Sequence, residues 1–260
     1  MSDPTGAAEP NPEAPDNDQE PANDQLPAND QGLANEGAPA SEGSPASGVE
    51  PAEVPDPTMI APGDDTLAVV LAAGAGSRFS GDEHKLAATL KRKPLVWWAA
   101  THALSAGFAE VLVVEGATPV ADLVPPEVSI VHNDDWSDGQ ARSLQVAVHY
   151  ADTFGYDKVV IGLADQPFVP PGTWRAVAAT EAPIAVAQFD NDVTPPVALH
   201  RDVWRLLPLD GDEGARQLLR ARPELVTRVT CAGSAIDVDT AGALDQVRRH
   251  HLTKELGTWT

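Results

Sequence analysis

Between residues 66 and 260, short apolar runs alternate with longer segments in which apolar side chains recur every three or four positions. Short runs bounded by Gly, Pro or Asp are typical of strands buried on both faces, whereas the three-to-four spacing is typical of helices. Predicted strands lie at 67–71, 111–114, 128–131, 159–163 and 184–188. Predicted helices lie at 94–106, 138–154, 173–180 and 241–250. This alternation predicts an α/β fold: a doubly wound, mostly parallel sheet with helices on both faces.

Residues 1–65 differ in composition from the rest of the chain. They contain no Lys or Arg, 15 Asp and Glu residues and 12 of the 24 prolines, and Asn-Asp-Gln recurs at 17–19, 23–25 and 29–31. Such a segment cannot bury enough apolar surface to offset its conformational entropy. We therefore predict a disordered acidic arm over 1–65, carrying −15 of the formal net charge of −22, and one folded domain over 66–260.

Charge, hydropathy and cysteine content exclude several classes of protein. The folded part has 24 acidic against 17 basic residues, so no basic surface for nucleic acid is expected. No apolar run approaches the ~20 residues that cross a bilayer, and the N-terminus lacks the positive and apolar regions of a signal peptide. Cys231 is the single cysteine, which excludes an internal disulfide and a multi-cysteine zinc site. These features predict a cytoplasmic enzyme or binding domain.

A glycine-rich segment, Leu71-Ala72-Ala73-Gly74-Ala75-Gly76-Ser77-Arg78, follows the first predicted strand, and Lys85 comes shortly after it. Glycine lets backbone N–H groups approach an anion closely, and Arg and Lys add positive charge to an otherwise acidic chain. The segment is therefore predicted to bind phosphate; a turn without a ligand would not need the two cations. It is not a P-loop, because no Gly-Lys-Ser/Thr follows. It also departs from a dinucleotide-binding fingerprint, because Phe79 replaces a small residue and Glu115 lies 41 positions after Gly74.

Acidic residues follow the fourth predicted strand and precede the last predicted helix. Asp165 follows a predicted buried strand, where burying a carboxylate without a partner would cost free energy. It is therefore predicted either to bind Mg²⁺ beside a triphosphate or to cap the next helix. Asp239, with Asp237 as an alternative, is the candidate second Mg²⁺ ligand, and Asp239 or Thr240 is also the expected cap of the last helix. In a strand order 3-2-1-4, the glycine-rich segment and Asp165 would face each other across one crevice.

The motifs of the folded part occur in a defined order. They are Leu71-Ala-Ala-Gly-Ala-Gly-Ser-Arg78, Lys85, Pro94-Leu95, Asn133-x-x-Trp136-x-x-Gly139, Ser143-Leu144, Asp165-Gln166-Pro167, Gly211-Asp212-x-Gly214-Ala215-Arg216 and Asp237-x-Asp239-Thr240. This ordered set resembles the molybdenum-cofactor nucleotidyltransferases, within the larger class of nucleotidyltransferases with a Rossmann-like fold. The Ala-Ala-Gly and Ala-Asp-Gln-Pro motifs are closer to those of the cytidylyltransferase branch than to those of the guanylyltransferase branch.

The resemblance implies a Mg²⁺-dependent reaction in which a nucleoside monophosphate, CMP from CTP, moves to a phosphorylated acceptor such as molybdopterin and pyrophosphate is released. Arg78, Lys85 and Asp165 would be the catalytic residues, and Asp165 and Asp239 would hold the metal. The nucleotide would be bound by Leu71, Ala72, Ala73, Gly74, Gly76, Ser77, Asn133, Ser143, Gln166 and Pro167. A molybdenum-containing oxidoreductase or its maturation factor is a further implied partner.

One departure from the family pattern falls on the acceptor side. The family places a basic residue facing the pterin in the segment that corresponds to 191–196, and this chain has none there. The acceptor could therefore differ from molybdopterin. Two roles are open for Arg216, contact with the acceptor or a salt bridge on its own helix, and we favour the salt bridge.

Two other functions stay open at this point. The glycine-rich segment could bind NAD(P) in a reductase, although Phe79 and the displaced Glu115 speak against that. Alternatively, the domain could be a non-catalytic module that binds nucleotide and delivers cofactor to an oxidoreductase. Release of pyrophosphate would distinguish the predicted transferase from this module.

Overall fold

The computed structural model describes residues 56–59, 61–79, 84–234 and 236–251. The predicted arm lies mostly outside these residues, so its disorder and the domain boundary at 65/66 stay predictions. Within the described part of the chain, no helix is long and apolar enough to cross a membrane.

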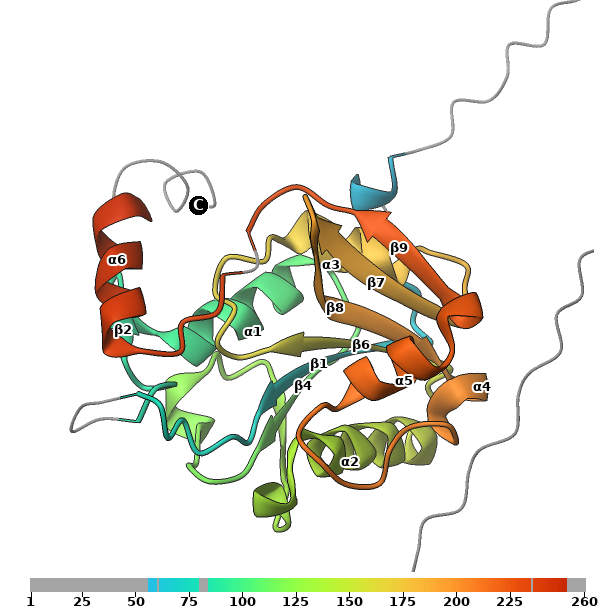
Figure 1. The fold of residues 1–260 in the computed structure, drawn as a ribbon, viewed down its shortest axis with the longest axis horizontal. Coiled ribbons are helices and arrows are strands. Elements are labelled where there is room, and N and C mark those ends of the chain that lie inside the picture. The colour runs from blue at the N-terminus through green and yellow to red at the C-terminus, as the bar shows by residue number, and fades with distance from the viewer. Residues whose placement is uncertain (1–55, 60, 80–83, 235, 252–260) are drawn as a thin grey trace, which may run out of the picture. The chain divides into compact units, whose positions relative to one another are not determined.

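Across the described residues, seven strands form one sheet in the order β5-β4-β1-β6-β8-β7-β9 (Figure 1). Their bounds are β1 Thr66–Ala72, β4 Val111–Glu115, β5 Ser129–His132, β6 Lys158–Leu163, β7 Ile184–Phe189, β8 Asp192–His200 and β9 Val226–Thr230. β8 is antiparallel to both of its neighbours, and the other pairs are parallel. The predicted mostly parallel sheet is confirmed, and β5-β4-β1-β6 is the predicted 3-2-1-4 order.

Helices cover both faces of the sheet. α1 Leu95–Ser105 and α3 Pro171–Ala178 cover one face, and α2 Gln140–Thr153, α4 Arg201–Trp204 and α5 Ala215–Ala221 cover the other. α6 Ala241–His251 packs instead against Leu90 and Leu95, away from the sheet (Figure 1). Short 3₁₀ turns lie at η1 Pro57–Met59, η2 Ala121–Leu123, η3 Trp136–Asp138 and η4 Pro223–Leu225. The predicted helices are therefore confirmed with bounds shifted by one or two residues.

β1 shows why the sheet carries a helix layer on each side. All seven of its residues are buried. Ala68 and Val70 pack into the core with α1 and α3, whereas Leu67 and Val69 pack into a second core with α2, α4 and α5. Because successive strand residues point to opposite faces, an unbroken apolar run can be buried only between two such layers.

Several elements were not predicted, for different local reasons. β8 contains Pro195 and Pro196, and proline lacks the N–H that a central strand needs, so the run did not read as a strand. α4 and α5 are only four and seven residues long and therefore give little periodic signal. β9, at the open edge of the sheet, has only two Val residues among Thr and Arg, so it lacks both an apolar run and an alternating pattern.

A two-stranded hairpin, β2 Thr89–Leu90 and β3 Lys93–Pro94, precedes α1. Lys91 and Arg92 form its turn, and both have positive φ, 45° and 68°. Two-residue hairpin turns of this kind favour Asn-Gly, because a Cβ disfavours the left-handed conformation. The turn therefore carries backbone strain that its two cationic side chains do not relieve.

Replacing the turn by Lys91→Asn with Arg92→Gly is expected to stabilise the protein by about 1 kcal/mol. The left-handed conformation costs about 1–2 kcal/mol per residue, and the substitutions relieve this cost. The higher entropy that glycine gives the unfolded chain offsets part of the gain. Equilibrium urea denaturation measures the change. The double variant Lys91→Ala with Arg92→Ala keeps both Cβ atoms and is the control, with no gain expected. A lower midpoint for the Asn-Gly variant than for wild type would contradict this explanation.

Candidate active site

A cleft of about 460 Å³ lies at the carboxyl ends of β1 and β6. We call it the main cleft. It is lined by Leu71, Ala73, Gly74, Ala75, Ser77, Trp136, Ser137, Gly139, Gln140, Ser143, Leu163, Asp165 and Asp212. Because β1 and β6 are adjacent and parallel, the loops that follow them meet at this edge. The glycine-rich segment and Asp165 thus share one cleft, as the predicted strand order required.

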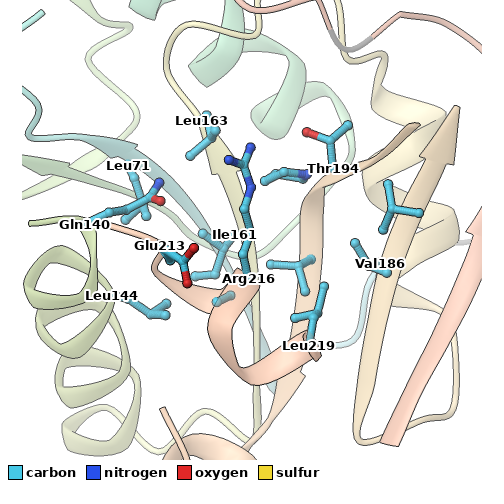
Figure 2. A pocket seen from close by; sticks show the side chains of 14 residues that line it. Leu71, Gln140, Leu144, Ile161, Leu163, Val186, Thr194, Glu213, Arg216 and Leu219 are labelled. Carbon is cyan, nitrogen blue, oxygen red and sulfur yellow. The ribbon is translucent and has the colours of Figure 1, made fainter. Parts of the chain in front are cut away.

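A smaller cavity of about 40 Å³ adjoins the main cleft (Figure 2). We call it the side cavity. The two spaces share Leu71, Gln140 and Leu163 in their walls. The side cavity extends under α5 and along β8. It therefore lies on the side of the main cleft away from the glycine-rich segment.

Glycine is favoured at positions 74 and 76 for different structural reasons. A Cβ on Gly74 would meet no atom of the described residues within 4 Å, and Gly74 does not have positive φ. Neither packing nor conformation within the described structure thus requires glycine there, and the open space belongs to the main cleft. Gly76 has φ +61°, and its Cβ would lie 3.1 Å from the Cβ of Lys85. Gly76 is therefore needed for the turn that brings Lys85 back toward the site.

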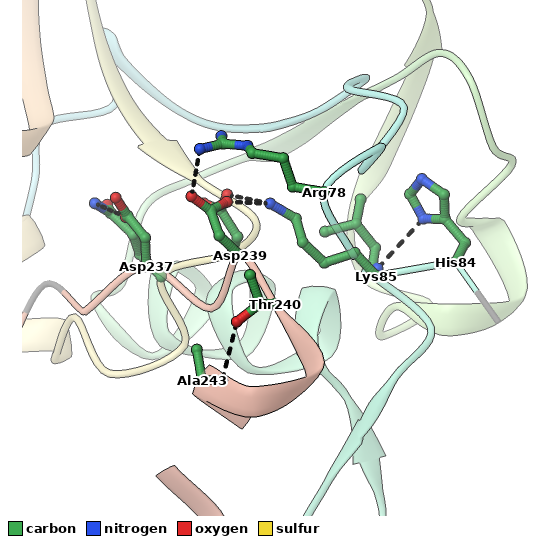
Figure 3. Close-up of polar contacts among 10 residues, drawn as sticks. Arg78, His84, Lys85, Asp237, Asp239, Thr240 and Ala243 are labelled. Atoms are coloured by element: carbon green, nitrogen blue, oxygen red, sulfur yellow. Dashed lines mark hydrogen bonds and ion pairs between the residues drawn. The ribbon is translucent and has the colours of Figure 1, made fainter. Parts of the chain in front are cut away.

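Lys85 joins three separate parts of the chain (Figure 3). Its Nζ lies 2.7 Å from Oδ2 of Asp165 and 2.9 Å from Oδ1 of Asp239. Arg78 reaches Asp239 from the rim, with its guanidinium 3.1 Å from Oδ2. The Lys85 side chain is 11% exposed and that of Arg78 is 78% exposed, so one cation is set within the protein and the other faces solvent. We call these four residues the charge cluster.

Lys85 and Asp239 stabilise each other's charged form. Burial would lower the pKa of Lys85, but the carboxylates of Asp165 and Asp239 outweigh burial and raise its pKa. Burial would likewise raise the pKa of Asp239, and its hydrogen bond and charge interaction with Lys85, together with Arg78, lower that pKa instead. Near neutral pH Lys85 is therefore a cation and Asp239 a carboxylate.

Asp237 and Asp239 serve different partners although only one residue separates them. Oδ1 of Asp237 accepts a hydrogen bond from Gln166 Nε2 at 2.8 Å, and Gln166 Nε2 also donates to Thr194 Oγ1 at 3.0 Å. The backbone N–H of Val238 donates to the carbonyl of Asp165 at 3.0 Å. Asp165 and Gln166 thus hold the 237–239 segment through two hydrogen bonds, and Asp239 alone of the two acidic residues meets Lys85.

The helix cap next to this segment leaves Asp239 available for the site. Thr240 Oγ1 accepts a hydrogen bond from the N–H of Ala243 at 3.0 Å, as an N-cap does (Figure 3). Of the two capping candidates the sequence offered, Thr240 is the cap of α6. Asp165 likewise does not open α3, because the helix begins at Pro171.

Asn133 and Ser143 support the opposite wall of the main cleft. Asn133 Nδ2 donates to Ser143 Oγ at 3.0 Å, and Asn133 Oδ1 accepts from the N–H of Asp135 at 3.1 Å. Asn133 is buried and does not line the main cleft, whereas Ser143 does. Asn133 therefore orients the loop that carries Trp136, and only Ser143 is placed to touch a ligand.

A glycine contact closes the same wall. Gly139 has φ 105°, and a Cβ there would lie 2.5 Å from the carbonyl oxygen of Gly211. The N–H of Ala141 donates to that carbonyl at 2.9 Å, and the N–H of Gly211 donates to the carbonyl of Asp138 at 3.1 Å. Trp136, Gln140 and Asp212, which the sequence did not assign to the site, are brought to the cleft by this contact. The two quoted motifs around Gly139 and Gly211 were its signal.

The predicted site residues therefore divide into three groups. Leu71, Ala73, Gly74, Ser77, Ser143 and Asp165 line the main cleft. Arg78, Lys85 and Asp239 reach its rim through the charge cluster. Ala72, Gly76, Asn133, Gln166 and Pro167 are not among the lining residues and lie behind them.

The charge cluster fits a hard divalent cation. Oδ1 of Asp165 is buried without a hydrogen-bond partner among the described residues, and carboxylate oxygens are the ligands that Mg²⁺ prefers. Within the described ranges, no group of three or more His, Cys, Asp or Glu side chains could hold a metal ion by itself. Two carboxylates suit an ion that completes its coordination with water and substrate phosphate oxygens.

The parallel sheet, the glycine-rich segment and the acidic pair at one cleft define a nucleotidyltransferase with a Rossmann-like fold. The model of the family described as MobA-like NTP transferase domain matches residues 68–226, and the chain belongs to this family. It is similar to the purine catabolism protein PucB of Bacillus subtilis, 33% identical over 198 residues that cover 70% of this chain and 96% of PucB.

Two further similarities bear on the site. The nicotine blue oxidoreductase of Paenarthrobacter nicotinovorans is 30% identical over 188 residues, covering 66% of this chain and 91% of that protein. The crystal structure of Rv0371C from Mycobacterium tuberculosis in complex with manganese superposes with a TM-score of 0.60 at 25% identity, covering 71% of this chain and 98% of that one. A divalent cation is therefore bound by a protein of this fold.

The pair of glycines gives a direct test of the main cleft. Gly74→Ala is expected to change the free energy of unfolding by less than about 0.5 kcal/mol, because its Cβ enters open space. It is expected to weaken nucleotide binding at least tenfold, because its Cβ would take up cleft space that the glycine-rich segment is predicted to leave for the nucleotide. Gly76→Ala is expected to cost about 1–2 kcal/mol through its left-handed conformation. Thermal unfolding and calorimetric titration with NTP measure the two effects. Wild-type nucleotide affinity in Gly74→Ala would contradict this placement.

Proposed function

We propose that the protein transfers CMP from CTP, with Mg²⁺, to a phosphorylated acceptor of the molybdopterin type and releases pyrophosphate. The observation that carries this proposal is the charge cluster at the rim of a cleft whose glycine-rich wall leaves room for a ligand. An acceptor phosphate oxygen forms the new bond to the α-phosphorus, and the bond from that phosphorus to the leaving pyrophosphate breaks.

The chain's own groups position the reactants and compensate charge. The backbone around Gly74 receives the triphosphate, and Lys85 and Arg78 are the cations placed to neutralise it. Asp165 and Asp239 would hold Mg²⁺, which supplies further charge neutralisation at the phosphates. Fixed charges of this kind act strongly in a site that is partly shielded from water.

The position of Lys85 has a consequence for binding order. Its ammonium lies between the two carboxylates that would hold the metal. Metal binding to both carboxylates therefore requires Lys85 to leave at least one of them, and the negative charge of a triphosphate gives it a new partner. We infer that the metal and the nucleotide bind together, as a complex.

The finer assignments rest on the sequence. The Ala-Ala-Gly and Ala-Asp-Gln-Pro motifs favour CTP as the donor. Membership of the MobA-like family favours an acceptor of the molybdopterin type. A molybdenum-containing oxidoreductase or its maturation factor is the partner that would receive the product. A screen of CTP, GTP, ATP and UTP against purified molybdopterin, read by pyrophosphate release, tests both assignments.

Asp165→Asn is expected to reduce pyrophosphate release at least about 100-fold, because it removes a charged metal ligand at the reacting phosphates while keeping the side-chain shape. Circular dichroism should show an unchanged fold. Asp134→Asn, whose side chain is 97% exposed beside the same edge of the sheet, is the matched control and should keep full activity. Full activity of Asp165→Asn with Mg²⁺ would remove Asp165 from the metal site.

A reductase is the second candidate, because the similar protein from Paenarthrobacter nicotinovorans is named an oxidoreductase. Fluorescence titration separates the two functions, since Trp136 lines the main cleft. CTP with Mg²⁺ is expected to change the tryptophan emission saturably, and NADH or NADPH is expected to cause no saturable change. Saturable binding of NADH, with no response to any NTP, would favour the reductase.

A further inference from the structure

The proposed function places the nucleotide in the main cleft and gives the side cavity no role. It is walled mainly by apolar side chains from α2, β6, β7, β8 and α5, which include Leu144, Ile161, Val186, Val197 and Leu219 (Figure 2). A water molecule needs about 10–15 Å³ of such space, so a cavity of about 40 Å³ admits about three waters. It can therefore take the edge of an apolar group that enters from the main cleft.

Arg216 is the cationic side chain in the wall of the side cavity. Figure 2 shows it extending from α5 along the cavity toward Leu163 and Thr194. Leu163 also lines the main cleft, so the guanidinium points to the place where the two spaces join.

The predicted salt bridge of Arg216 is absent among the described residues. The acidic residue one turn away, Glu213, pairs with Arg220 instead. Arg216 also lies in the first turn of α5, where a positive charge opposes the helix dipole, whereas Arg220 lies in the last turn, where the dipole favours it. Neither an ion pair among the described residues nor the helix dipole therefore accounts for a cation at 216.

The wall that faces Arg216 offers no cation of its own. The 191–196 segment, which contributes Val193, Thr194 and Pro195 to the wall opposite α5, contains no basic residue. An anionic group on the acceptor would therefore find its cation on α5.

We propose that the side cavity and Arg216 form the acceptor subsite, which takes a phosphate monoester with a planar or apolar body. The guanidinium binds the phosphate through two parallel hydrogen bonds, and the apolar edge of the body enters the side cavity. The phosphate oxygen then attacks the α-phosphorus of the nucleotide, and the electron pair of the broken bond leaves with pyrophosphate. This inference rests on the proposed function and adds the residue that selects the acceptor.

The binding test uses phenyl phosphate as a minimal probe with one ring and one phosphate. Calorimetric titration of the full chain, saturated with α,β-methylene-CTP and Mg²⁺, should show binding that weakens at least tenfold in Arg216→Leu. Arg216→Lys should fall between the two, because lysine keeps the charge without the planar pair of donors. Arg220→Leu, on the same helix but paired with Glu213, is the matched control and should bind as wild type does.

The outcomes separate this inference from the proposed function. Equal affinity of wild type and Arg216→Leu, or binding of phenyl phosphate only when the CTP analogue is left out, would overturn the acceptor subsite. Probe binding that depends on Arg216, in a chain that releases no pyrophosphate from any NTP with molybdopterin, would support the subsite and count against the proposed transfer. In an active enzyme, Arg216→Leu should raise the KM for the acceptor at least tenfold and leave the KM for NTP unchanged.

Discussion

The Lys85 ammonium is the contact on which the arrangement of this site depends. It binds carboxylates that lie 80 and 154 positions away in the sequence, one at the end of β6 and one before α6. Without a cation between them, two carboxylates in a partly buried position would repel each other. The same contact therefore holds the acidic pair together and anchors Lys85 at the edge of the sheet where β6 ends.

The glycine-rich segment shows how one motif can combine two physical needs. Gly76 is there for the backbone, since its positive φ turns the chain toward Lys85. Gly74 is there for the space in front of it. A sequence pattern gives both positions the same letter, and only the atoms around each glycine separate the conformational reason from the spatial one.

Much of the fold could be predicted because its central strands are locally explicit. The unbroken apolar runs of β1, β4 and β6 require cover on both faces, and the intervening helices have clear three-to-four spacing. β8 could not be predicted, because Pro195 and Pro196 argue against a strand unless the antiparallel pairing is known. In the site, Asp165 and Lys85 stood out by their chemistry. The contact of Gly139 with Gly211, which places Trp136 and Asp212, joins segments more than 70 residues apart, so the motif around each glycine marks its own segment but does not show that the two segments meet.

The reversed direction of β8 has an evolutionary consequence. The parallel strands deliver their ends to the active-site edge, whereas β8 delivers its beginning there, joined to β7 by the tight bend at Asp190 and Asn191. Insertions or deletions at this bend would reshape the wall next to Thr194 without shifting the register of β1, β4 or β6. Selection can therefore vary the wall next to Thr194 while the wall formed by the ends of β1 and β6 stays constant, which is a structural route to paralogues whose clefts differ on one side only.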